Sequence, residues 1–523
     1  MSFSRPAVSK SFPWLPLAAG ALLLLLALHL FRETPYLWLN AIIASVGVVF
    51  AAAGAWGLLR GTWPVWLEPG LARVAAWVDV RADRLVLALL GLLLSAAARS
   101  AAGDGSLVHS PTAAPLWVAG ITLVVVGLGR KQDRPGSRRW PLWEILLVIA
   151  LGLGSLWLRA WRAESWPHVL SGDEGSVGMT AWEFRAGQRD NLLSLGWWSF
   201  PALYFWLVSL SQAVFGRTVE AIRWVSALGG APTVVALYAA ARSMFGRPVA
   251  IWSALWLSGF HHHLFFSRVA YNNIWDGLFF IVAAGSIWHG WNRGRRSAYL
   301  WAGLALGLGQ YFYTTSHLAL LVLGIWLILL HRPRRASPDP APRGGWPDVA
   351  CLALVTVAAV LPLALLYLEH PESLVYTSER VTLFPPGWEQ VAETLGLTPL
   401  GLVLEQMGVT ALGFVVAELE GVYYAPGVPL LFSLSALFFV VGLIICLLHL
   451  RDPRYVLPLL TLAGTVVVGG LSIQAPNGQR MMLLPPMLAL MVALPLSRHG
   501  CGSAGLGRSR IGPWWRAAPA WWW

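Results

Sequence analysis

Charged residues and cysteine are both scarce in this chain of 523 residues. Only 12% of its residues are charged and only three are cysteine, whereas 57% are hydrophobic and the mean hydropathy is +0.62. Such a composition excludes an ordinary soluble domain and indicates a polytopic α-helical membrane protein. Because Cys351 and Cys446 fall in apolar runs and Cys501 in the C-terminal tail, we expect no disulfide framework on the outer side.

Long apolar runs recur along the whole chain, and about fourteen of them meet the length expected of a membrane span. The fold class is therefore predicted to be all-α. The runs lie near residues 15–31, 36–59, 85–102, 113–129, 141–158, 219–241, 249–266, 274–291, 298–312, 316–330, 349–368, 427–448, 456–473 and 482–496. The two beside the polar turn at residues 310–317 are short, so they also fit a broken or re-entrant pair.

Three arginine-rich clusters, at residues 130–139, 293–296 and 332–335, decide the predicted orientation. All three fall on one side of these spans, and the positive-inside rule makes that side cytoplasmic. We expect a multi-pass protein of the plasma (inner) membrane with both termini in the cytoplasm and a retained first span. A span at residues 200–215 would turn the later clusters outward, so we predict an interfacial helix there.

The net charge of +12 is explained by these clusters and the tail, which predicts contact with anionic membrane lipids and no nucleic-acid partner. We divide the chain into an N-terminal four-helix membrane region at 1–140, a membrane core at 141–497 and an Arg- and Trp-rich cytoplasmic tail at 498–523. The core has two long outer loops, at 159–217 and 369–426. Long loops gathered on one face mark that face as the working one.

The acidic pair Asp173-Glu174 lies in the first of these outer loops, just after a predicted span. Carboxylates close to a bilayer are energetically costly, and this favours a catalytic role for the pair. The alternative interpretation is that the acids cap a following helix. Arg268, Arg223 and Arg480 lie near outer ends of spans, where guanidinium groups match phosphate oxygens; the alternative for each is an arginine that snorkels to the interface.

The order of features from Pro141 to about Leu300 is specific. After the acidic pair come an aromatic stretch that ends at Phe215-Gly216, then Ala221-Ile222-Arg223, and then the outer junction at residues 266–276. This order resembles the integral-membrane glycosyltransferases of the GT-C class, in the protein mannosyltransferase and aminoarabinose-transferase group.

The resemblance implies a GT-C-like core in which a sugar moves, with inversion, from a polyprenyl-phosphate donor to a lipid, glycan or protein acceptor at the extracytoplasmic face. It makes Asp173 the catalytic base and Glu174 its partner. The second acid of the family falls on Asn273, with Asp276 a turn further. Outer lysines common in the family are absent here, so arginine must contact the donor phosphate.

Further substrate-binding candidates are aromatic or polar residues near the outer face. His263, Tyr313 and His317 belong to this set, and in the second outer loop Glu379-Arg380 and Tyr423-Tyr424 are candidate acceptor contacts without a motif. Consecutive histidines at 261–263 point in different directions on a helix, so we predict no metal site. No cofactor is indicated, and a need for a divalent cation stays open.

Two other classes of function compete with this hypothesis. A transporter or flippase for lipid or polysaccharide predicts ionisable residues in mid-span and matching broken helices in two halves. The acids of this chain gather in an outer loop instead. A non-catalytic scaffold has only the Trp-rich tail in its favour. The sugar, the acceptor and the oligomeric state are not specified by these patterns.

Overall fold

The structure is a computed structural model of the chain, and it describes residues 14–33, 37–60, 68–130, 140–332, 344–379, 388–472 and 474–498. Over these residues the predicted all-α fold is confirmed, since helices carry the architecture and extended backbone pairs only in isolated bridges. The described residues leave out 131–139 and 333–343, which contain most of two basic clusters. They also leave out the tail after residue 498, Arg380 and the side chain of Glu379.

The N-terminal region contains a short additional helix beside the four that were predicted. Its helices are α1 (Trp14–Glu33), α2 (Leu37–Arg60), α3 (Glu68–Trp77), α4 (Ala82–Ala102) and α5 (Ala113–Leu128). Small residues let α4 and α5 approach closely, because a Cβ on Gly91 would lie 2.5 Å from the carbonyl oxygen of Gly120.

The rest of the chain forms the larger part of the bundle. In chain order its elements are α6 (Leu142–Ala160), α7 (Gly172–Arg185), η1 (Trp197–Ser199), α8 (Leu203–Phe215), α9 (Val219–Met244), α10 (Arg247–Gly259), α11 (His261–Phe266), α12 (Ile274–Arg293), α13 (Arg296–Gly309), α14 (Ser316–His331), α15 (Trp346–Glu369), α16 (Pro371–Glu379), α17 (Trp388–Thr394), α18 (Pro399–Leu412), α19 (Ser433–Leu448), α20 (Pro453–Gly470), η2 (Gly478–Met481) and α21 (Pro485–Arg498).

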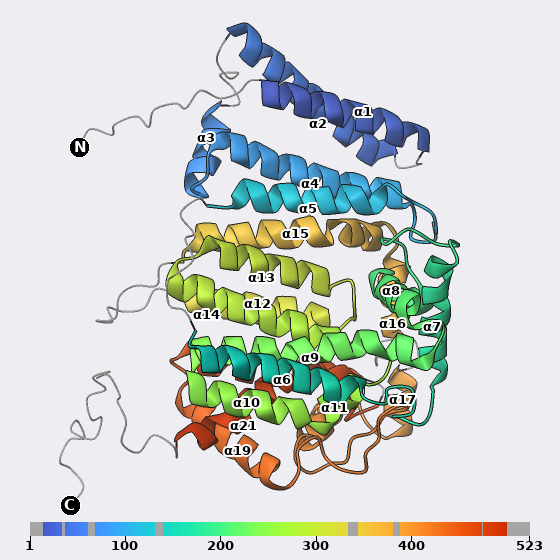
Figure 1. Ribbon diagram of the computed structural model, residues 1–523, viewed down its shortest axis with the longest axis vertical. Helices are drawn as coiled ribbons and strands as arrows, with labels where there is room; N and C mark the ends of the chain where they lie inside the picture. The colour runs from blue at the N-terminus through green and yellow to red at the C-terminus, as the bar shows by residue number, and fades with distance from the viewer. Residues whose placement is uncertain are drawn as a thin grey trace, which may run out of the picture.

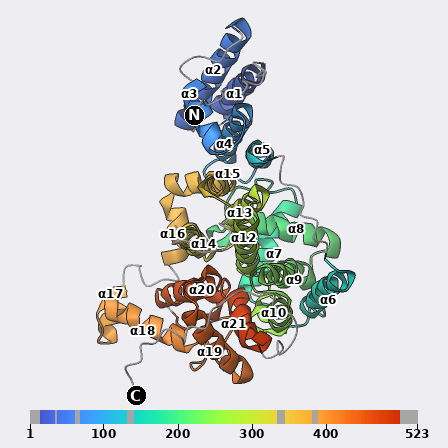
Figure 2. The ribbon, with the colours of Figure 1, turned by 90° about the vertical axis from the view of Figure 1, so that its left-hand side faces the viewer.

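The long helices lie side by side with roughly common axes, as Figures 1 and 2 show from two directions. The N-terminal pair α4 and α5 packs on α15, and the indole nitrogen of Trp117 donates to the carbonyl oxygen of Ala359 at 2.8 Å. The N-terminal helices therefore share a buried core with the rest of the bundle. The proposed boundary at residue 140 remains a sequence-based division.

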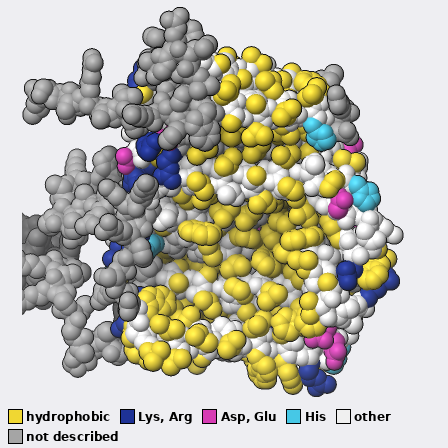
Figure 3. Space-filling model, turned by 45° about the horizontal axis from the view of Figure 1, so that its top comes forward, with side chains coloured by type: hydrophobic (Ala, Val, Ile, Leu, Met, Phe, Trp, Pro, Cys, Tyr) yellow, Lys and Arg dark blue, Asp and Glu magenta, His cyan; other side chains and the backbone are white. Residues whose placement is uncertain are grey.

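On the face seen in Figure 3, hydrophobic side chains form a broad belt, and charged side chains lie toward its two ends. By length and composition, six described helices are apolar enough to cross a membrane, and other described apolar helices are shorter. The predicted count of fourteen spans stays a prediction. One predicted span, 249–266, is interrupted: α10 ends at Gly259, Phe260 is extended, and α11 follows as a separate short helix.

The two polar ends of the bundle differ in content. One end, which we call the arginine end, carries the ion pairs of Arg130 with Asp79 and of Arg296 with Asp348. The opposite end, which we call the loop end, carries α7, α8, α11 and α16 (Figure 1). Helix α8 lies across the ends of the long helices there, as an interfacial helix would (Figures 1 and 2).

Candidate active site

The acidic pair opens helix α7 at the loop end. Ser171 is the N-cap of this helix: its hydroxyl accepts from the backbone nitrogen of Glu174, and the Glu174 carboxylate accepts from the backbone nitrogen of Ser171, both at 3.2 Å. This reciprocal capping box satisfies two backbone donors that a helix start leaves over. The cap interpretation is therefore correct for Glu174.

Glu174 is also half of a buried ion pair. Its two carboxylate oxygens accept from Nε and Nη2 of Arg223 at 2.8 and 2.9 Å, and both side chains are only 1% exposed. The Ala270 amide donates a further bond at 2.9 Å. Arg223 also donates to the carbonyl oxygens of Ala163, Pro167 and Val169. This arginine, a candidate for the donor phosphate, is thus engaged in holding the loop before α7.

Asp173 has different surroundings, although it is adjacent in sequence. It is half-buried and borders a cavity of about 280 Å³ at the loop end. The Tyr423 hydroxyl donates a hydrogen bond to its carboxylate, and burial together with this bond raises the pKa of Tyr423, which stays a donor at neutral pH. Asp173 also lies in the first turn of α7, where the helix dipole favours a negative charge.

The cavity is enclosed by segments that are far apart in the sequence. Its polar lining comprises Asp173, Asn272, Gln474, Asn477, Gln479 and Arg480, and its aromatic lining comprises Trp197, Trp198, Phe200, Tyr204, Phe205, Tyr271, Tyr313 and Tyr423. Tyr271 is tied to the cap of α7, because its hydroxyl lies 2.8 Å from the Ser171 hydroxyl, and its ring contacts that of Tyr423.

Arg480 reaches this cavity from the short element η2, near the C-terminal end of the core. The backbone of Glu420 donates to the carbonyl oxygen of Pro476 at 2.9 Å, so the segment before η2 is joined to the loop that carries Tyr423. Burial lowers the pKa of Arg480 while the nearby Tyr313 raises it, and an arginine remains a cation under either influence. The structure therefore brings one carboxylate and one guanidinium to the same cavity.

Arg268, the other phosphate candidate, does not line this cavity. Its guanidinium donates to four carbonyl oxygens around the end of α6, those of Leu158 (2.5 Å), Arg159 (3.2 Å), Trp161 (2.7 Å) and Trp166 (3.2 Å). A cation at a helix C-terminus satisfies carbonyls that have no partner within the helix. The structure gives Arg268 the geometry of a helix cap.

Three polar candidates are buried behind the cavity wall. His263 contacts Arg159 through Nδ1 at 2.9 Å, the Asn273 amide donates to the carbonyl oxygen of Gln479 at 3.0 Å, and Asp276 accepts from the Thr315 hydroxyl. These side chains are at most 1% exposed. Asn273 thus supports the segment that carries Arg480, and none of the three borders the cavity.

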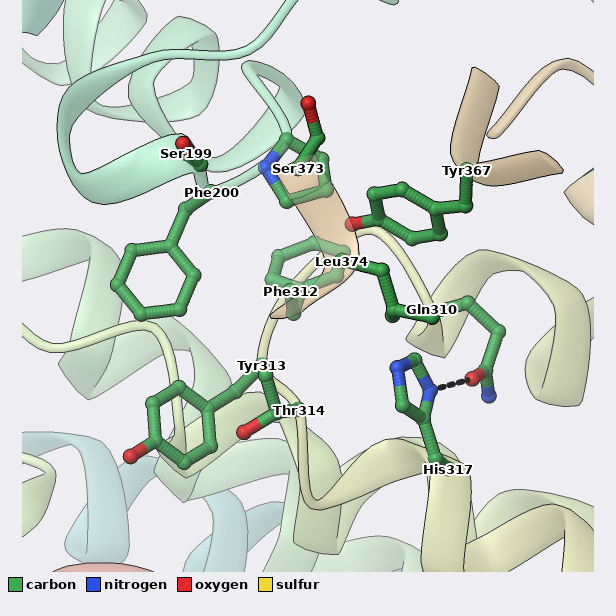
Figure 4. Close-up of a pocket in the computed structure, with 11 residues that line it drawn as sticks. Ser199, Phe200, Gln310, Phe312, Tyr313, Thr314, His317, Tyr367, Ser373 and Leu374 are labelled. Atoms are coloured by element: carbon green, nitrogen blue, oxygen red, sulfur yellow. Dashed lines mark hydrogen bonds between the residues drawn. The ribbon is translucent and has the colours of Figure 1, made fainter. Parts of the chain in front are cut away.

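Tyr313 and His317 lie on the turn between α13 and α14. Tyr313 borders the main cavity and also, with Phe200, a small neighbouring hollow that His317 lines. Figure 4 shows this hollow, where His317 Nδ1 lies 2.7 Å from the Gln310 side-chain oxygen while the Tyr313 hydroxyl points the other way. Tyr313 therefore belongs to the Asp173 cavity and His317 to its neighbour.

Several lining residues were not among the predicted site residues. Trp197 and Trp198 directly precede the predicted interfacial helix, and Asn272 and Gln479 carry no motif that would single them out. Tyr423 was proposed as an acceptor contact, whereas the structure places its hydroxyl on Asp173. Among the described residues, no group of three or more His, Cys, Asp and Glu side chains is placed to hold a metal ion.

Comparison with known proteins supports the family resemblance. Residues 199–363 match the family described as dolichyl-phosphate-mannose-protein mannosyltransferase. A curated relative from Pseudomonas aeruginosa, named undecaprenyl phosphate-alpha-4-amino-4-deoxy-L-arabinose arabinosyl transferase, is 30% identical over 137 residues, which cover 25% of this chain and 25% of the relative. These matches confirm the resemblance to the GT-C class, and the family match covers residues 199–363, less than a third of the chain.

Solved structures also match part of this chain, at low sequence identity and with TM-scores below 0.5. ArnT from Cupriavidus metallidurans, solved with undecaprenyl phosphate, matches with a TM-score of 0.47 at 16% identity, over 69% of this chain and 61% of ArnT. The oligosaccharyltransferase of Archaeoglobus fulgidus matches with a TM-score of 0.45 at 15% identity, over 69% of this chain and 51% of that protein. The chain thus spans about a quarter of the curated relative and between half and two thirds of these structures.

Proposed function

We propose that this protein is a membrane glycosyltransferase that moves a sugar, with inversion, from a polyprenyl-phosphate donor to an acceptor at the extracytoplasmic face. The observation that carries the proposal is the placing of Asp173 and Arg480 on one cavity at the loop end. Transfer from a sugar phosphate needs a base for the acceptor and a cation for the leaving phosphate, and this cavity holds both. The acceptor is a lipid, a glycan or a protein.

The reaction balances with these two groups. The acceptor oxygen or nitrogen forms a bond to the anomeric carbon as its proton passes to the Asp173 carboxylate. The bond between the anomeric carbon and the phosphate oxygen breaks, and its electron pair leaves on the phosphate, where the Arg480 guanidinium stabilises the negative charge. Attack opposite to the leaving phosphate inverts the anomeric configuration. Tyr423 holds the carboxylate in place by its hydrogen bond.

The membrane orientation is part of the proposal. The arginine end is cytoplasmic by the positive-inside rule, which places the Asp173 cavity on the extracytoplasmic side. The donor phosphate then lies at the outer headgroup level while its lipid tail remains in the bilayer. The domain matched by the mannosyltransferase family, residues 199–363, contributes part of the cavity wall, including Tyr271 and Tyr313.

The decisive experiment replaces Asp173 by asparagine, which preserves shape and removes the base. We expect Asp173→Asn to fold and bind donor while it loses transfer by about two to four orders of magnitude. Purified protein would be assayed with polyprenyl-phosphate sugars in lipid nanodiscs, with binding and turnover measured separately. Glu164→Gln is a matched control, because Glu164 is an exposed carboxylate in the same loop and does not line the cavity.

Two outcomes would contradict the proposal. Wild-type turnover in well-folded Asp173→Asn protein would mean that the acidic pair only caps a helix. Donor movement across vesicle membranes without sugar transfer would instead favour a flippase.

A further inference from the structure

The groups that line the cavity fall into two charged ones and a larger neutral set. Among the lining residues that the structure describes, Asp173 and Arg480 carry the charges. In the proposed reaction the first takes the acceptor proton and the second binds the donor phosphate. The groups left to recognise the sugar are the phenolic hydroxyls of tyrosines and side-chain amides. The amides include those of Asn272, Asn477 and Gln479.

Two of these amides are buried and anchored by one end. Asn272 is 7% exposed, and its Nδ2 donates to the carbonyl oxygen of Phe312 at 2.5 Å. Asn477 is 5% exposed, and its Oδ1 accepts from the backbone nitrogen of Gln479 at 3.0 Å. The other atom of each amide, Asn272 Oδ1 and Asn477 Nδ2, takes part in neither bond. Held in this way, the two side chains offer one acceptor and one donor to sugar hydroxyl groups.

An aromatic wall completes the cavity. Trp197 and Trp198 contact each other at 5.6 Å between ring centroids, and Trp198 also contacts Tyr376 on α16 at 6.2 Å. Trp198 and Ser199 have positive φ values of 60° and 57°, a conformation that is unfavourable for non-glycine residues. The turn that presents this wall is thus kept despite a local cost, as expected for a binding surface.

The cavity volume limits the size of the sugar. At about 280 Å³ the cavity lies near the lower limit of small-molecule pockets, which is roughly 300 Å³, and this suits a single sugar ring better than an oligosaccharide. Flat aromatic faces pack well against the C–H face of such a ring, while the amides bind its hydroxyl groups.

A charged sugar would meet an unfavourable environment. Among the lining residues that the structure describes, Asp173 is the one carboxylate that an ammonium group could use as a counter-ion, and the acceptor proton needs that carboxylate. A sugar carboxylate would compete with the donor phosphate for Arg480 and would face Asp173 at close range. Burial of a charge without its own partner is costly, and like charges brought together add to that cost.

We propose that the donor carries one neutral, hydroxyl-bearing sugar, and that amino sugars and uronic acids are rejected. This inference rests on the proposed function and specifies its substrate class. Its test uses purified full-length protein in nanodiscs and three donors on the same polyprenyl phosphate: a hexose, the same hexose with one hydroxyl replaced by an amine, and the matching uronic acid. Release of polyprenyl phosphate by slow hydrolysis of the donor gives a readout that needs no known acceptor.

We expect the neutral hexose to exceed both charged donors in kcat/KM by roughly two orders of magnitude. Equal or better use of the amino-sugar donor would overturn this inference and leave the glycosyltransferase function intact. Binding of none of the three donors would overturn the proposed function together with the inference.

A charge introduced into the cavity gives the second test. Gln479→Glu should raise the use of the amino-sugar donor relative to the neutral one by about tenfold, since it supplies the missing carboxylate. Gln188→Glu is the matched control, because Gln188 is exposed on the turn after α7 and lies outside the cavity. An unchanged donor preference in folded Gln479→Glu protein would contradict the assignment of the neutral lining to the sugar.

Discussion

Asp173 and Glu174 show how two adjacent carboxylates acquire different tasks. Successive residues of a helix point about 100° apart, so one side chain turns inward and the other turns toward the cavity. Glu174 is matched by Arg223 and by backbone amides, and such a saturated carboxylate is poorly placed to accept a substrate proton. Asp173 keeps contact with the cavity and receives a hydrogen bond from Tyr423.

The hydrogen bond from Tyr423 leads to a prediction about the base. Tyr423→Phe should lower kcat by roughly ten- to a hundredfold with little change in donor affinity, because a hydrogen bond to a charged group contributes about 1.5–3 kcal/mol. Single-turnover kinetics with separately measured donor binding would check it. Tyr424→Phe is the matched control, since the Tyr424 hydroxyl contacts His261 and does not line the cavity. Equal losses in both variants would speak against a specific role for Tyr423.

Arg480 is expected to carry most of the phosphate recognition. Arg480→Ala should weaken donor binding by about one to two orders of magnitude, and Arg480→Lys should restore little of it, because an ammonium group does not provide the two parallel bonds of a guanidinium. Equilibrium binding of polyprenyl phosphate alone would measure the effect. Normal affinity in the alanine variant would remove Arg480 from the site.

At the scale of elements, arginine side chains hold the loop before α7 and the end of α6. Arg223 joins α9 to three carbonyl oxygens of the loop at residues 163–169, and Arg268 covers the carbonyl oxygens at the end of α6. Glycine contributes at one close approach, because a Cβ on Gly230 would lie 2.1 Å from the Ser267 hydroxyl oxygen. Of these contacts, those of Arg223 hold the loop that leads into α7 and also bind Glu174, the neighbour of Asp173.

The buried pair of Glu174 and Arg223 should be sensitive to the loss of one charge. Glu174→Gln leaves a buried guanidinium without its counter-ion, which typically costs about 3–5 kcal/mol. We expect a clear fall in the thermal unfolding temperature in detergent and a loss of transfer that follows the loss of folded protein. Glu183→Gln on the same helix is the control, because its pair with Arg189 is partly exposed and worth at most about 1 kcal/mol. Similar unfolding temperatures for the two variants would argue against the buried pair as a structural anchor.

Substitution of Arg268 tests whether this residue caps α6 or binds the donor phosphate. Arg268→Ala should lower the unfolding temperature, because four carbonyl oxygens lose their donor. Donor affinity per folded molecule should change much less than in Arg480→Ala. A selective loss of donor binding with unchanged stability would return Arg268 to the phosphate site.

At the scale of the whole molecule, the two ends of the bundle differ in charge and content. The arginine end contains ion pairs such as that of Arg296 with Asp348, whereas the cavity lies at the loop end. Single cysteines at Glu164 and Arg295, in a background without Cys351, Cys446 and Cys501, would test the proposed orientation. We expect an impermeant maleimide to label position 164 in intact cells and position 295 only after lysis. The reverse pattern would invert the topology and place the cavity in the cytoplasm.

The helical membrane fold and the resemblance to GT-C glycosyltransferases were predictable from the sequence. Long apolar runs that leave every backbone group to be satisfied within the segment allow little other than helices in a bilayer. The acidic pair was also visible from the sequence, because carboxylates are rare beside membrane spans. The family resemblance depended on the order of such features along the chain, which needs no knowledge of their contacts.

Only the tertiary structure decided which of these polar residues share the cavity. Arg223, Arg268 and Arg480 all lie near predicted outer ends of spans, and hydropathy cannot distinguish among them. Their roles depend on which carbonyl oxygens or carboxylates come within about 3 Å, and those partners lie up to 110 residues away in the chain. Tyr423 joins Asp173 across some 250 residues for the same reason: hydrogen bonds are short-ranged, and the packing of helices alone brings such distant residues together.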